Sequence, residues 1–173
     1  MRFLVEPAKV GVLVFVAAIL QVTLFSSAEI LGGTPDVVLL TLTAIALLRG
    51  SVYGASAGFA AGLLVDTANL GTLGVTSLLL TIAGYWIGRY GETTGRDRAH
   101  APVLSIAVTT IAYQFAALVL RYMLGQNAPG GEIFAGLAPT VLLNLILALP
   151  VYALTRRLLR PYEWTPREVR LLG

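Results

Sequence analysis

The chain has 173 residues, and its composition excludes a water-soluble globular domain. Hydrophobic residues make up 57% of it and charged residues only 12%, whereas charged residues make up about 25% of a soluble domain. The mean hydropathy is +0.81, so polar side chains are too few to cover a globule of this size. The composition therefore predicts an integral membrane protein.

Several kinds of chemistry are excluded as well. The chain has no Cys, which removes disulfides, thiolate metal sites and Cys nucleophiles, and it has one His, His100. No Ser–His, clustered Asp or Glu–His arrangement is present, and the Gly-rich loops lack the Lys-Ser/Thr of a nucleotide site. The net charge of +3 reflects basic residues scattered among apolar runs, which favours orientation in a bilayer over nucleic-acid binding. We therefore expect no enzyme, no cofactor and no metal.

Apolar runs along the chain predict an all-α polytopic protein with six transmembrane helices. A spanning helix needs about 20 mostly apolar residues, and short charged or Gly/Pro-containing segments separate the runs. They cover about residues 8–27, 35–48, 51–66, 73–90, 102–124 and 133–155. None of the connections can hold a soluble domain, so we expect one transmembrane domain over 1–160 and a tail over 161–173 that is either interfacial or free in the cytoplasm.

The basic residues predict how these helices are oriented. Six crossings place both termini on one side, and every basic residue except Arg121 falls on that side: Arg2, Lys9, Arg49, Arg89, Arg96, Arg98, Arg156, Arg157, Arg160, Arg167 and Arg170. The positive-inside rule makes this side cytoplasmic. We therefore expect both termini in the cytoplasm.

Two of the predicted spans are short for a membrane. At 1.5 Å per residue, segments 35–48 and 51–66 reach only about 21 and 24 Å, against a hydrocarbon core of about 30 Å. They form either a tight helical hairpin that turns at Arg49, Gly50 and Ser51 or a re-entrant pair that does not fully cross. The charge distribution does not separate these two arrangements.

The third predicted span carries the clearest pattern. Gly54, Gly58 and Gly62 recur every four residues, which leaves one helix face almost bare of side chains and lets another helix approach closely. That helix belongs either to the same chain, which we favour, or to a partner protein.

Two acidic residues lie near the predicted outer ends of helices. In Thr34-Pro35-Asp36 we expect Thr34 to cap a helix, Pro35 to occupy its first position and Asp36 to complement its dipole. Asp66 closes the third span, where it either caps a loop or fixes the outer loop for an extracytoplasmic partner.

Three amides are predicted at membrane depth. Gln21, Gln114 and Asn144 lie within the first, fifth and sixth spans, where an unsatisfied amide is costly. We expect them to form interhelical hydrogen bonds; a ligand pocket is the less favoured interpretation.

The order of these motifs resembles the rod shape-determining protein MreD family. The resemblance rests on Pro35-Asp36 opening an apolar helix, on Gly58-Phe59-Ala60-Ala61-Gly62-Leu63-Leu64-Val65-Asp66, on Gly71-Thr72-Leu73-Gly74 and on Gly84-Tyr85. It implies a non-enzymatic subunit of the bacterial cell-elongation machinery in the inner membrane. The implied partners are MreC, MreB, RodA and a class B penicillin-binding transpeptidase. The implied motif residues are Pro35, Asp36, Asp66, Gly71, Gly74 and Tyr85.

The same resemblance implies a fold like that of the substrate-binding subunits of energy-coupling-factor vitamin transporters. Two functions follow: a scaffold that binds MreC and helps control peptidoglycan synthesis, or a transporter subunit that captures a small molecule. The short outer loops offer few polar residues for a ligand, which favours the scaffold. In the scaffold, Arg89, Arg96 and Arg98 would contact anionic lipid or a cytoplasmic partner.

Overall fold

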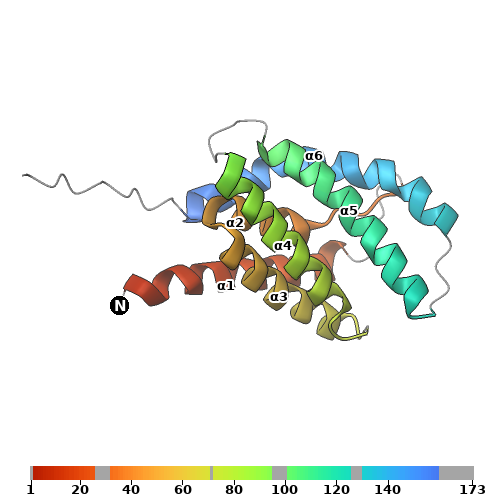
Figure 1. The fold of residues 1–173 in the computed structure, drawn as a ribbon, viewed down its shortest axis with the longest axis horizontal. Coiled ribbons are helices and arrows are strands. Elements are labelled where there is room, and N and C mark those ends of the chain that lie inside the picture. The colour runs from red at the N-terminus through yellow and green to blue at the C-terminus, as the bar shows by residue number, and fades with distance from the viewer. Residues whose placement is uncertain (1, 26–31, 71, 95–100, 126–129, 160–173) are drawn as a thin grey trace, which may run out of the picture.

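The structure is a computed structural model that describes residues 2–25, 32–70, 72–94, 101–125 and 130–159, and over these residues it is a helical bundle (Figure 1). The helices are α1 (Arg2–Leu20), continued by a short π-helix η1 (Gln21–Phe25), α2 (Val37–Arg49), α3 (Ser51–Ala68), α4 (Val75–Thr94), α5 (Ala101–Met123) and α6 (Gly130–Leu159). The six predicted helical segments are confirmed. Within the described residues, three segments are long and apolar enough to cross a membrane: Pro7–Leu24, Pro102–Met123 and Gly136–Leu159. The crossing of the membrane by six helices stays a prediction.

Helix α2 forms the centre of the bundle. It contacts α1, α3, α4, α5 and α6, and every residue from Val38 to Leu47 is buried. A helix buried on all sides needs apolar residues all round rather than a single stripe, which explains why its sequence is almost uniformly apolar. Its polar Thr43 is fully buried, and the hydroxyl donates to the Leu39 carbonyl at 2.8 Å.

The other helices pack around α2 mainly in sequential pairs. Helices α3 and α4 pack closely as an antiparallel hairpin, and α5 and α6 lie side by side (Figure 1). Arg49 Nη2 donates to the Leu159 carbonyl at 2.7 Å, and Ser51 bonds Glu92. The C-terminal ends of α2, α4 and α6 therefore meet at one end of the molecule. We call it the basic end, because Arg49 lies there. The N-terminus of α1 lies at the same end in Figure 1.

Candidate functional site

The glycine face of α3 lies against α4 of the same chain. A Cβ atom added at Gly54 would meet the carbonyl of Gly84, and one at Gly58 would meet the carbonyl of Leu80. At Gly62 it would meet the backbone of Ser77. These contacts are backbone against backbone, so the face has no room for a second helix while α4 occupies it.

Two carboxylates fasten the ends of this helix pair. Asp66 of α3 is 4% exposed and accepts from the backbone N–H groups of Gly74, Thr76 and Ser77 at 2.8, 3.3 and 3.4 Å. It thereby satisfies the free N–H groups at the start of α4, where the helix dipole also favours a negative charge.

Glu92 of α4 makes the corresponding interaction at the basic end. It accepts from the backbone N–H of Ser51 at 2.8 Å and from the Ser51 hydroxyl at 3.0 Å. These two hydrogen bonds, with a smaller contribution from Arg89 at 3.6 Å, lower the pKa of the Glu92 carboxyl. Each helix of the pair therefore caps the other. Sequence analysis missed Glu92, because its partner is 41 residues away along the chain.

The start of α2 differs from the prediction. Asp36, not Thr34, is the N-cap: its carboxylate accepts from the Leu39 N–H at 2.8 Å, and the helix begins at Val37. The prediction of a Thr34 cap was wrong because the backbone N–H of Thr34 is directed at α6, where it donates to Thr140 Oγ1 at 3.2 Å. Pro35 consequently precedes the cap instead of opening the helix.

The extended backbone before α2 packs against the bundle, with Gly33 and Pro35 buried and Thr34 exposed, and polar side chains form hydrogen bonds with it. Asn144 of α6 is fully buried; its Oδ1 accepts from Asp36 N at 2.9 Å, and its Nδ2 donates to Thr110 Oγ1 at 3.2 Å. Gln21 of η1 donates to Pro35 O at 3.2 Å and accepts from Val37 N at 2.8 Å. Non-helical backbone is tolerated at membrane depth only where protein or a cavity surrounds it.

The extended segment before α2 adds to the length of the second predicted span, which is short for a membrane. The 13 residues of α2 cover about 20 Å, and the four residues 33–36, which follow the turn at Gly32, add about 13 Å. The extension lies along α6, since Gly33 packs on Pro139 and Gly136 lies beside Gly32 O. Helix and extension together have the length of a crossing segment, with Gly50 turning the chain at the basic end.

A polar cavity of about 460 Å³ lies at the end of the bundle opposite the basic end. It is surrounded by η1, the start of α2, the end of α3, the start of α4 and the middle and end of α5. Its polar lining residues are Gln21, Thr34, Asp36, Asn69, Thr76, Tyr113, Gln114 and Arg121. The interhelical bonds predicted for Gln21 and Asn144 are confirmed, whereas Gln114 makes no hydrogen bond to the described residues and faces this cavity.

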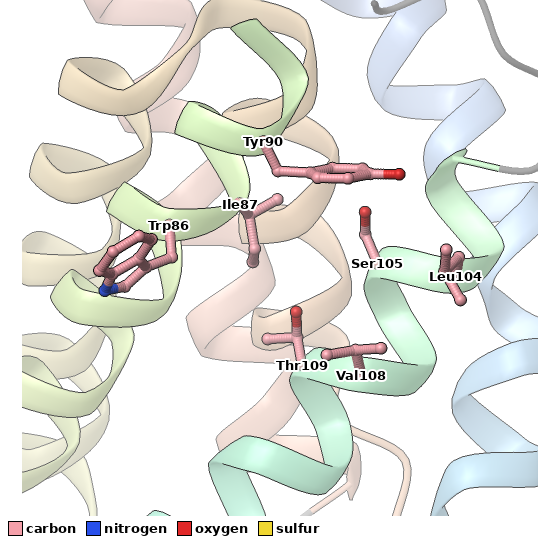
Figure 2. Close-up of a pocket in the computed structure, with 7 residues that line it drawn as sticks. All are labelled: Trp86, Ile87, Tyr90, Leu104, Ser105, Val108 and Thr109. Atoms are coloured by element: carbon pink, nitrogen blue, oxygen red, sulfur yellow. The ribbon is translucent and has the colours of Figure 1, made fainter. Parts of the chain in front are cut away.

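A second hollow, of about 220 Å³, separates α4 from α5 toward the basic end (Figure 2). It is mostly apolar, but the Ser105 hydroxyl points into it from α5, facing the Tyr90 side chain on α4. Ser105 is 8% exposed, and its Oγ has no hydrogen-bond partner in the described structure. We call this hollow the α4–α5 groove; its lining residues are Trp86, Ile87, Tyr90, Leu104, Ser105, Val108 and Thr109.

The remaining predicted residues that the structure describes are partly or largely exposed. Tyr85 is exposed and packs edge-on against Trp86, with ring centroids 5.9 Å apart. Gly74 has a φ of 95°, which favours glycine at this turn. The Arg89 side chain is 59% exposed at the basic end. Gly71, Arg96, Arg98 and the tail 161–173 lie outside the described residues.

Comparison with known families identifies the family of the chain. The family model for rod shape-determining protein MreD matches residues 1–162 of the chain. The chain belongs to the MreD family. Membership gives it a role in rod shape determination; MreD is a shape-determining structural family and not a known enzyme family. No curated protein and no solved structure matches the chain, so the likeness to vitamin-transporter subunits receives no support.

Membership and structure agree on the kind of protein. The family and the three long apolar helices fit an inner-membrane protein. In the described residues, no group of three or more His, Asp or Glu side chains is placed to hold a metal ion. The side chains that the structure brings together are instead caps, helix contacts, a polar cavity and an apolar groove.

Proposed function

We propose that this MreD-family chain is a non-enzymatic membrane scaffold of the cell-elongation complex, and that it binds the transmembrane helix of MreC in the α4–α5 groove. Family membership supports the role in shape determination. The observation that carries the docking site is the buried Ser105 hydroxyl, which has no partner among the described residues and lies in a mostly apolar groove. Through MreC, the scaffold would join MreB, RodA and a class B penicillin-binding transpeptidase.

A transmembrane helix is the occupant that this groove suits. Apolar side chains facing lipid gain no hydrophobic drive from binding another helix, so affinity must come from close packing and from polar contacts. The groove supplies both, because it is recessed and because the Ser105 hydroxyl can bond a polar group of an incoming helix. The glycine face of α3 cannot serve this purpose, since α4 already covers it.

The basic end supplies a second contact in this proposal. Arg89 is exposed there, and the sequence places Arg96 and Arg98 a few residues further on. Each basic residue close to an anionic leaflet contributes about 1 kcal/mol to the attraction between the protein and the membrane surface. We assign them to anionic lipid first and to a cytoplasmic partner such as MreB second.

The docking site is tested by filling the groove. Val108 lines it and is 58% exposed, so Val108→Trp should occupy the space with little effect on the bundle. Ile146→Trp is the matched control, because Ile146 is 70% exposed on α6 and lies outside the groove. The measurement is co-purification, in nanodiscs, of the full chain with MreC truncated to its transmembrane helix and flanking residues.

We expect Val108→Trp to reduce the amount of retained MreC fragment at least tenfold, and Ile146→Trp to leave it unchanged. Equal retention by both variants would place the MreC contact elsewhere on the chain. Failure of the wild-type chain to retain the fragment would refute the scaffold proposal itself.

A further inference from the structure

We propose that the polar cavity opposite the basic end is a binding site for a small zwitterion, a molecule that carries one anionic and one cationic group. The inference is independent of MreC binding, because the cavity and the α4–α5 groove share no lining residue. Its volume of about 460 Å³ falls within the range of about 300 to 1,000 Å³ that is typical of ligand pockets.

The cavity is polar although it is built from the apolar helices of a membrane protein. Polar side chains reach its wall from η1, from the segment before α2, from the turn after α3, from α4 and from α5. A polar group at membrane depth costs free energy unless it is hydrogen-bonded, and packing alone would fill the space with apolar side chains. The convergence of polar groups is therefore the pattern of a binding pocket, in which a few placed polar groups orient the ligand.

Two of the lining side chains, Gln114 and Arg121, are not engaged by any residue that the structure describes in the way that Gln21 is. Gln21 is engaged by the backbone at the start of α2. By contrast, the Gln114 side chain makes no hydrogen bond, and the Arg121 side chain no ion pair, to any residue that the structure describes. An amide and a guanidinium facing the cavity offer donors to a ligand, and a guanidinium matches a carboxylate in two parallel hydrogen bonds.

The charges on the wall indicate a zwitterion rather than a simple anion. Asp36 and Arg121 both line the cavity, Asp36 at the start of α2 and Arg121 near the end of α5. Asp36 would attract a ligand ammonium and Arg121 a ligand carboxylate. The other acidic group nearby, Asp66, accepts three backbone N–H groups of α4, whereas Asp36 accepts the Leu39 N–H through Oδ1. The site therefore offers the Asp36 carboxylate and the Arg121 guanidinium to a ligand.

The test uses the full chain in nanodiscs and a defined set of probes. The probes are the standard amino acids and glycylglycine, and binding is measured by isothermal titration and native mass spectrometry. The strongest binder is then compared with its N-acetyl derivative, which lacks the ammonium, and with its amide, which lacks the carboxylate. We expect saturable binding of at least one zwitterion, and at least tenfold weaker binding of both derivatives.

Variants connect the binding to this cavity. Arg121→Gln should lower the affinity for the zwitterion at least tenfold and abolish the preference for the zwitterion over its amide. Gln114→Met should lower the affinity severalfold. Phe115→Leu is the control, because Phe115 lies beside Gln114 on α5 but is 60% exposed and outside the cavity. Size-exclusion profiles and helical circular dichroism confirm that each variant folds.

Two results would overturn the proposal: no saturable binding of any probe at millimolar concentration, or binding that Arg121→Gln leaves unchanged. Retention of the MreC fragment by Arg121→Gln is expected to be normal. Loss of zwitterion binding with MreC retained therefore separates this proposal from the proposed scaffold function.

Discussion

Replacing Gly58 by alanine is the sharpest test of the packing between α3 and α4. The added Cβ would overlap the Leu80 carbonyl, and even the third nearest atom, the backbone N of Thr81, would be only 2.9 Å away. Ordinary van der Waals contacts of a Cβ begin at 3.4 Å. The obstructing atoms are backbone and cannot rotate away, so the two helices must separate by at least about half an ångström at this level.

That separation affects more than one contact. Overpacking of a close interface costs about 1 to 3 kcal/mol, and moving α3 from α4 also strains the caps made by Asp66 and Glu92 at the two ends of the pair. For a domain of this size, each kcal/mol lowers the melting temperature by about 2 to 4 °C. We expect Gly58→Ala to lower it by about 3 to 10 °C, and Gly58→Leu to prevent normal assembly.

The assay is thermal unfolding of the detergent-purified chain, followed by size-exclusion chromatography of the heated samples. Gly11→Ala is the matched control, because Gly11 lies in α1 with no atom within 4 Å of an added Cβ, and alanine is the better helix former. It should melt at the wild-type temperature or slightly above. If Gly58→Ala has the same melting temperature as Gly11→Ala, the backbone contact between α3 and α4 is not tight and the reasoning fails.

Three further predictions follow from other contacts. Asn144→Leu leaves the backbone N–H of Asp36 buried without a partner and should destabilise the chain by about 1 to 3 kcal/mol; wild-type melting would contradict this. The pKa of Glu92 is lowered below its ordinary value of 4.5, so its contribution is present above that value and lost as the pH falls below it. The melting temperature of wild type should therefore exceed that of Glu92→Gln at pH 7, with the difference shrinking below about pH 4.5; a difference that grows at low pH would contradict the cap. For topology, an impermeant thiol reagent outside intact cells should label Met123→Cys and spare Thr93→Cys, and the reverse result would invert the predicted orientation.

The sequence by itself determined the features that depend on local composition and periodicity. The six helical segments follow from apolar runs, and the family follows from motifs spread over most of the chain. A close helix approach at Gly54, Gly58 and Gly62 could be predicted because the spacing of four residues places all three on one face. These properties depend on neighbours along the chain, so they can be read without knowing the fold.

Tertiary structure decided which distant groups meet. It selected α4 as the partner of the glycine face, moved the α2 cap from Thr34 to Asp36, and showed that Glu92 caps a helix 41 residues away. The polar cavity and the α4–α5 groove are likewise products of several helices. No local pattern marks such features, because a hydrogen bond or a cavity wall depends on the distance between atoms in space, and packing around α2 sets that distance.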